Sequence, residues 1–107
     1  MSRESLGHFE LLVLLALLRL GDEAYGVPIA NAVAHSTGKR VILASVYNTL
    51  ERLEEKGFVT STIGQPTPER GGRAKRYYAI TTAGLREVRA AKKALTVLWR
   101  GIPVHEG

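Results

Sequence analysis

The sequence predicts a mainly α-helical fold that carries one small β-hairpin. Two observations predict it. Apolar residues recur at helical spacing in residues 8–56 and again in residues 81–98, and strand-like alternation flanks a glycine- and proline-rich loop between them. Three helices, a two-stranded hairpin and a last helix form the order of a winged helix-turn-helix with a C-terminal helix. We expect a winged helix-turn-helix domain in residues 1–80 and a dimerisation helix with its tail in residues 81–107.

Size and composition are those of one folded unit. The chain has 107 residues, of which 45% are hydrophobic, and this suits a single globular core. It contains no cysteine, so disulfides and thiolate metal sites are excluded and the cytoplasm is the expected location. The longest apolar run, Leu11 to Leu18, is far shorter than the roughly 20 residues of a membrane span. We therefore expect no membrane contact.

The first two helices are bounded by glycines. Residues 8–20 are apolar on nearly all sides, so this helix must be covered on two faces, and Gly21 ends it. After a turn at residues 25–26, Pro28 suits the first turn of a second helix because its missing N–H costs little there. Gly38 is placed to end that helix as a left-handed cap.

A third helix is predicted over residues 43–56, where Gly57 stops it. Its apolar stripe comprises Val46, Leu50 and Leu53. The other face carries side chains that form hydrogen bonds: Ser45, Asn48, Thr49 and Arg52, with Tyr47 beside them. Because carboxylates repel phosphates, we expect the three glutamates of this helix to point toward its end or into solvent: Glu51, Glu54 and Glu55. Arg52 and Lys56 are spaced to pair with neighbours on the same helix.

A hairpin and a last helix complete the pattern. Residues 58–63 and 75–80 have strand composition and should pair. The tip of this hairpin, taken to include the start of the second strand, holds four bases and no acid over seven residues, namely Arg70, Arg73, Lys75 and Arg76. Thr81 is a suitable N-cap for the last helix. Gly84 is a poor helix former in its first turn, which either close approach of another backbone or tolerance near a helix end explains.

The positive charge is localised along the chain. The net charge is +5, with −2 in residues 1–36, +4 in residues 37–80 and +3 in residues 81–107. A localised basic region favours a polyanionic partner, and a solvated basic surface is the alternative.

Three stretches resemble the PadR family of bacterial transcriptional regulators. They are Tyr25-Gly26 with Ile29, SVYNTLERLEEKGFV at residues 45–59, and GGRAKRYYAITTAG at residues 71–84. The resemblance is to the short branch of the family, which has a single C-terminal helix. Members often carry Ser-Pro-Gly where this chain has Ile42-Leu43-Ala44, so the usual N-cap serine is absent and Ser45 is a candidate cap for a shorter helix.

The resemblance implies a homodimeric repressor that binds double-stranded DNA. It implies two recognition helices in successive major grooves and a C-terminal helix that dimerises. Some members release DNA when a small aromatic or drug-like molecule binds. The expected DNA-binding residues are Lys39, Arg40, Ser45, Tyr47, Asn48, Thr49, Arg52, Arg73, Lys75 and Arg76.

Among these, Asn48 suits adenine, and Arg52 suits guanine or a phosphate. Arg73 is the best candidate for a minor-groove or phosphate contact. For Tyr47 two interpretations stay open: the ring packs inward, or the hydroxyl reaches a phosphate.

Dimerisation is expected because one small domain cannot cover both sides of the first helix, and no later domain covers the last one. The expected contact residues are Leu11, Leu15, Leu85, Val88, Leu95 and Leu98. An effector site for a flat aromatic molecule is expected near the symmetry axis, from Leu11, Leu15, Leu95 and Trp99. The alternative is that Trp99, the single tryptophan, simply fills the dimer interface.

Other function classes fit less well. The three histidines, His8, His35 and His105, lack ligand spacing, and there is neither a nucleophile–base arrangement nor a phosphate loop. We therefore expect no metal, no cofactor and no enzyme activity. The remaining alternatives are a winged helix that binds an acidic protein partner and a winged-helix regulator of another family.

Overall fold

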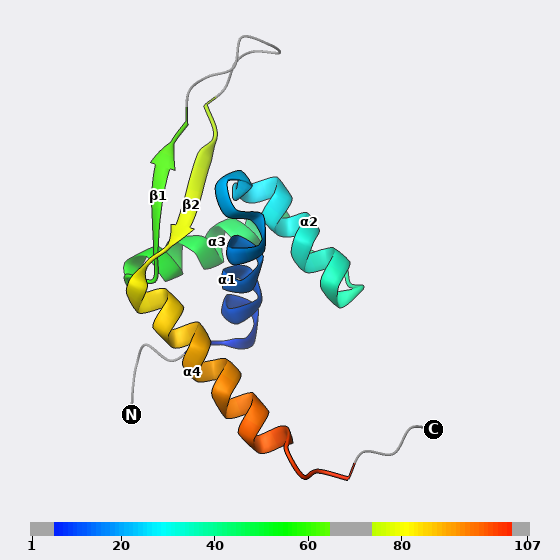
Figure 1. The fold of residues 1–107 in the computed structure, drawn as a ribbon. Coiled ribbons are helices and arrows are strands. Elements are labelled where there is room, and N and C mark those ends of the chain that lie inside the picture. Colours follow the sequence, from blue (N-terminus) through cyan, green and yellow to red (C-terminus); the bar gives the residue numbers. More distant parts are fainter. Residues whose placement is uncertain (1–5, 65–73, 104–107) are drawn as a thin grey trace.

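The computed structural model describes residues 6–64 and 74–103, and it confirms the predicted fold class of helices with one small hairpin. Its elements, in chain order, are α1 (His8–Leu20), the short 3₁₀ helix η1 (Gly21–Glu23), α2 (Gly26–Thr37), α3 (Leu43–Glu55), β1 (Val59–Ile63), β2 (Arg76–Ile80) and α4 (Thr82–Trp99) (Figure 1). The hairpin and α4 extend in opposite directions from a body formed by α1, α2 and α3.

The first three helices pack around one apolar core. Its largest fully buried side chains come from all three helices and from the start of β1: Val13, Leu14, Ile29, Val46, Thr49, Leu50, Leu53 and Val59. Burial of this apolar surface is the main favourable contribution to folding. The apolar stripe predicted for the third helix therefore faces the core, and the opposite face of α3 is left to solvent.

The ends of α2 and α3 follow from local chemistry. Gly38 adopts a left-handed conformation with φ of 70°, and its N–H donates to the Ala34 carbonyl at 2.9 Å, as predicted for a glycine cap. At the start of α3 the N-cap position is Ile42, whose side chain cannot cap. Ser45 does not cap a shorter helix, because α3 already begins at Leu43. Its hydroxyl is therefore left for other contacts.

The hairpin is joined to the helical body at its base. β1 and β2 are antiparallel, with Val59 opposite Ile80. The segment before α2 adds a third backbone partner, because Tyr25 bridges Tyr77 and the Tyr78 N–H donates to the Ala24 carbonyl at 2.8 Å. These bonds fix the direction in which the hairpin leaves the body.

Gly84 lets α4 cross close to the start of the hairpin. The Thr81 hydroxyl accepts a hydrogen bond from the Gly84 N–H at 3.0 Å, which confirms the predicted N-cap. A Cβ atom at position 84 would collide with the Phe58 carbonyl and press against Ile80. Close approach of another backbone is therefore the reason for this glycine.

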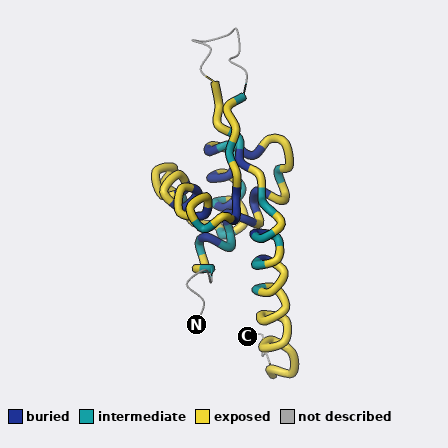
Figure 2. The backbone as a smooth tube through the Cα atoms, turned by 90° about the vertical axis from the view of Figure 1, so that its left-hand side faces the viewer, coloured by how far each residue is buried: buried dark blue, intermediate teal, exposed yellow. Residues whose placement is uncertain are grey.

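Only the first half of α4 packs on the body. Gly84 and Val88 are buried, whereas residues 92–99 are exposed (Figure 2). The dimer contact expected of Val88 needs correction, because its side chain already belongs to the core of the single chain. Leu85 is half-buried, and the expected contact residues Leu95 and Leu98 are exposed.

Candidate nucleic-acid interface

The exposed face of α3 carries most of the polar residues expected there. Ser45, Tyr47, Asn48 and Arg52 are all exposed. Thr49 is the exception: it is only 1% exposed, because it lies between Val46 and Leu53 on the helix and faces the core with them. Thr49 was expected on the exposed face as a DNA contact, and this placement is wrong because the side chain is buried. It instead accepts a hydrogen bond from the Arg52 guanidinium at 3.1 Å.

Arg52 and Lys56 share one partner on α1. The Glu10 carboxylate accepts hydrogen bonds from the Lys56 ammonium at 2.9 and 3.0 Å and lies 3.9 Å from Nε of Arg52. The prediction that both cations pair with neighbours on their own helix holds for Arg52, which donates to Thr49, and is wrong for Lys56, whose partner is on α1. Glu10 lies 46 residues before Lys56 in the chain, where no pattern of spacing reveals the pairing. Glu10 thus ties the start of α1 to the end of α3.

The protonation state of the Glu10 carboxyl follows from the groups around it. Burial raises the pKa of its carboxyl, but the hydrogen bond from the Gly7 N–H and the charge and hydrogen bonds of Lys56 outweigh burial. The pKa of Glu10 is therefore held below its ordinary value, and the group is ionised at neutral pH. An ionised Glu10 restricts Arg52 to an orientation along the flank of α3.

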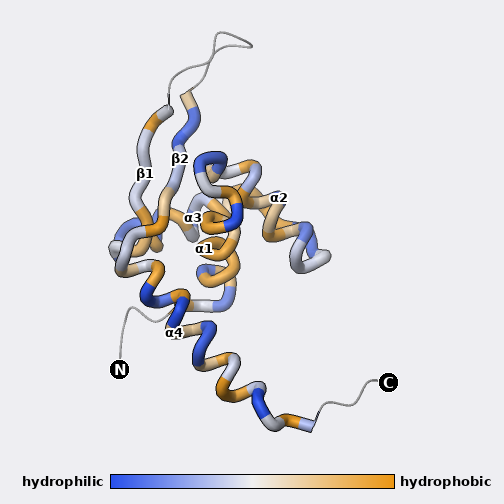
Figure 3. Tube along the Cα trace, in the orientation of Figure 1, coloured by the Kyte–Doolittle hydropathy of each residue, from blue (hydrophilic) through white to orange (hydrophobic). Residues whose placement is uncertain are grey.

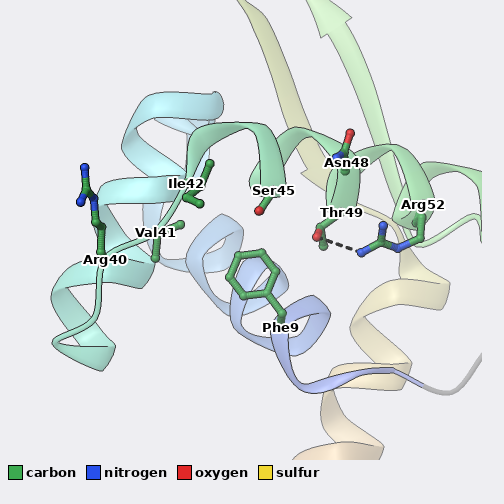
Figure 4. A pocket seen from close by; sticks show the side chains of 8 residues that line it. All are labelled: Phe9, Arg40, Val41, Ile42, Ser45, Asn48, Thr49 and Arg52. Atoms are coloured by element: carbon green, nitrogen blue, oxygen red, sulfur yellow. Dashed lines mark hydrogen bonds between the residues drawn. The ribbon is translucent and has the colours of Figure 1, made fainter.

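A pocket of about 410 Å³ lies along this flank (Figure 4). We call it the flank pocket; it is lined by Phe9, Arg40, Val41, Ile42, Ser45, Asn48, Thr49 and Arg52. Phe9 and the two aliphatic residues form its apolar part, while Arg40 and Arg52 approach from opposite ends. Two guanidinium groups and the Ser45 hydroxyl suit a partner that carries negative charge and hydrogen-bond acceptors. Lys39 lies beside Arg40 in the exposed link before α3.

Tyr47 lies against the start of α2. A Cβ atom at Gly26 would collide with the ring and hydroxyl of Tyr47, so the glycine provides the space that this ring occupies. The side chain is nevertheless 43% exposed. The ring thus packs against α2 while part of the side chain remains exposed, and a phosphate contact of the hydroxyl stays a prediction.

The β1–β2 hairpin is the wing of the fold, and contacts with neighbouring side chains position Lys75 and Arg76 on it. The Lys75 ammonium lies 4.5 Å from the ring centroid of Tyr25 and donates to its hydroxyl at 3.4 Å, while Tyr77 meets the same ring edge-on at 5.4 Å. On the other face of the hairpin, Arg76 donates to the Ser61 hydroxyl at 3.0 Å. Arg73, expected to enter the minor groove, lies outside the described residues.

Aromatic residues that position Lys75 were not among the predicted site residues. From the sequence, Tyr25 is part of a turn and Tyr77 part of a strand, and both lie in stretches that resemble the family. Their cation–π and edge-on contacts join two segments 52 positions apart, Tyr25 and Tyr77. Tyr77 directly follows Lys75-Arg76, but Tyr25 has no base beside it in the sequence, so no local signal indicates that the two rings meet.

A second surface, apolar in character, lies between α1 and α4. Leu11, Leu15 and Leu95, with Val88, Lys92 and Thr96, line a groove of about 260 Å³. Figure 3 shows α1 hydrophobic along nearly its whole length, whereas α4 alternates between hydrophobic and hydrophilic residues. Trp99 is 65% exposed and is not among the residues that line this groove. The structure thus brings together three of the four residues expected at the effector site.

Comparison with known proteins identifies the family. The model of the transcriptional regulator PadR-like family matches residues 14–90, from α1 to the middle of α4. The chain belongs to the PadR-like family of transcriptional regulators. Regulators of this family are DNA-binding proteins that typically dimerise, and they are not enzymes, so the expectation of a non-enzymatic protein is confirmed. No curated protein sequence matches the chain.

Solved structures agree with this PadR assignment. A PadR family transcription regulator from hypervirulent Clostridium difficile R20291 superposes with a TM-score of 0.72 at 21% identity, covering 88% of this chain and 93% of that one. A PadR family regulator from Eggerthella lenta DSM 2243 gives 0.64 at 30% identity, with 84% and 76% covered. A transcriptional regulator from Clostridium thermocellum gives 0.66 at 26% identity, with 86% and 84% covered.

Residues 6–64 and 74–103 form neither a cluster of metal ligands nor a membrane-spanning helix. Within these ranges, no three His, Asp or Glu side chains gather as they would around a metal ion. No helix there has both the length and the apolar character that crossing a bilayer requires.

Proposed function

We propose that this PadR-like protein is a homodimeric repressor that binds a pseudo-palindromic operator through α3 and the wing, with residues 1–80 binding DNA and residues 81–107 dimerising. One observation carries the proposal: the exposed hydrogen-bonding face of α3 is flanked by cations on both sides. Arg40 and Arg52 border the flank pocket, and Lys75 and Arg76 lie on the wing. Such a face offers base contacts at its centre and phosphate contacts at its edges.

Within this face, Asn48 and Ser45 are placed for base edges or nearby phosphates. Asn48 projects away from the body between the flank pocket and the hairpin (Figure 4). Arg52 is partly committed to Glu10 and Thr49, so its remaining donors are those at the outer end of the guanidinium. We assign Asn48 to a base contact and Arg52 to a phosphate or guanine.

The proposed dimer rests on apolar surface that the single chain leaves uncovered. Leu15 on α1 and Leu95, Leu98 and Trp99 on α4 are all exposed, with Leu98 at 72%. Leu15 and Leu95 line one groove, and Leu98 and Trp99 follow on the same helix; several large exposed apolar groups so close together favour an interaction surface over a solvated one. Pairing across a two-fold axis covers these groups and sets two copies of α3 side by side for half-sites about one helical turn apart.

An effector is proposed for the same apolar surface. The α1–α4 groove supplies aliphatic walls, and Lys92 at its edge supplies a cation for an anionic aromatic molecule. Trp99 lies outside the groove on the exposed end of α4, and as the only tryptophan its emission reports on the proposed dimer surface around it. A planar aromatic acid that quenches its emission saturably and also weakens operator binding supports the effector site. If no compound changes the emission of operator-competent protein, Trp99 simply fills the interface.

Selection of duplexes from a random pool tests the DNA-binding proposal. The full chain should enrich a motif with two related half-sites, and Asn48→Ala should relax one position in each half. A winged helix that binds an acidic protein partner instead would enrich no sequence. In that case the alternative becomes the better account of the basic face.

A further inference from the structure

The three glutamates of α3 differ in their surroundings. Glu54 accepts a hydrogen bond from the Ser61 hydroxyl at 2.9 Å, and Ser61 in turn accepts from Arg76. Glu54 is therefore part of the contact between α3 and the wing. Glu51 is exposed, and no hydrogen bond or ion pair joins it to any residue in 6–64 or 74–103. Glu51 thus points into solvent, which is one of the two directions expected for these glutamates.

Glu51 shares the outward face of α3 with Asn48. The two residues are three positions apart, which places them on the same side of a helix, about 4.5 Å apart along its axis. Val46, Leu50 and Leu53 face the core, so the direction opposite to them passes between Asn48 and Glu51. A partner that receives Asn48 must also meet the Glu51 carboxylate.

A carboxylate in a DNA major groove is selective because it only accepts hydrogen bonds. Guanine and thymine present acceptor oxygens to the major groove, and adenine presents its amino group beside the acceptor N7. Cytosine is the one base whose own major-groove hydrogen-bonding group is an amino donor alone. An ionised glutamate is therefore attracted to one base and repelled by the acceptors of the others, which is how specificity against wrong partners arises.

We propose that Glu51 is a specificity-determining residue that accepts a hydrogen bond from the exocyclic amino group of a cytosine in each half-site. The inference rests on the proposed function, since it requires α3 in the major groove. Base pairs are stacked about 3.4 Å apart, so this cytosine lies one or two base pairs from the base that Asn48 contacts. The general repulsion between Glu51 and phosphates is the cost of this selectivity.

The test compares the motifs that variants select from a random duplex pool. Wild type should enrich cytosine at one position of each half-site. Glu51→Ala should lose the preference at that position alone, with discrimination there falling on the order of tenfold. Glu51→Gln should move the preference toward adenine, because a glutamine amide both donates to N7 and accepts from N6.

Glu55→Gln is the matched control. It removes the same charge one turn further along the exposed side of α3, and it should leave the motif unchanged. The proposal is overturned if Glu51→Ala tightens binding to all duplexes equally while the motif stays the same, since Glu51 would then be only a repelling surface charge. If wild type enriches a motif in which no cytosine preference is lost in Glu51→Ala, the cytosine contact is refuted while the proposed function stands. If wild type enriches nothing, both fail.

Discussion

Replacing Glu10 with glutamine tests how α1 supports the recognition helix. The carboxylate is 7% exposed and is bound by the Gly7 N–H at 2.8 Å and by the Lys56 ammonium at 2.9 Å. Glutamine keeps the size of the side chain but removes its charge. A hydrogen bond to a charged group contributes about 1.5–3 kcal/mol. Lys56 can turn to solvent in the variant, so we expect Glu10→Gln to lower the free energy of unfolding by roughly 1–3 kcal/mol at pH 7.

The pH dependence of this loss has a defined sign. The folded-state pKa of Glu10 lies below its unfolded value, so its contribution is fully present above the unfolded pKa and is lost as pH falls through the folded pKa. The deficit of Glu10→Gln should therefore shrink as pH falls below 4.5, the ordinary value of this carboxyl. Urea unfolding at several pH values and one protein concentration measures it. A deficit no larger than that of the exposed Glu55→Gln control, or one independent of pH, refutes the reasoning.

Three further predictions concern the fold, the dimer and the DNA contacts. Gly84→Ala should lower the free energy of unfolding by about 1–3 kcal/mol, because the added Cβ meets the Phe58 carbonyl. Gly7→Ala, whose added Cβ makes only ordinary contacts, should change stability far less. Thermal melts measure both variants, and equal losses would contradict the prediction. Leu98→Glu should give monomers at micromolar concentration in sedimentation, while Val97→Glu, among the basic residues on the other side of α4, should stay dimeric. Lys75→Ala should weaken binding to all duplexes alike and reduce the slope of log affinity against log salt concentration by about one. Asn48→Ala should instead lower the binding free energy by about 1–3 kcal/mol at one base position. A changed motif for Lys75→Ala would argue against a phosphate contact.

Much of the fold could be predicted because it depends on local patterns. The apolar spacing of α3 and the alternation in the hairpin are properties of short segments, as is the left-handed glycine at position 38. Gly84 was the informative case. A poor helix former in a first turn left a tight contact and simple tolerance near a helix end both open, and the Phe58 carbonyl that decides between them could not be identified without the fold.

The candidate site was less predictable because its geometry depends on contacts between distant segments. The sequence predicts Thr49 on the exposed polar face, yet its position one turn from Val46 and Leu53 places it in the core. Glu10 lies in an apolar helix and gave no sign that it binds Lys56. The role of Glu51 was obscured by a general rule, since carboxylates are unfavourable near phosphates on average but selective at a cytosine edge.

The salt dependence of operator binding tests the central claim most directly. Two protomers, each using cations beside α3 and on the wing, should neutralise about six or more phosphates in total, which corresponds to a log–log slope of roughly −5 or steeper. The measurement is the association constant of the full chain between about 50 and 200 mM salt. It is made for the selected duplex and for a scrambled duplex of equal length. We expect a steep slope for both duplexes and tighter binding of the selected one at every salt concentration. A slope near zero, or equal affinity for the two duplexes, would contradict DNA recognition by α3 and the wing.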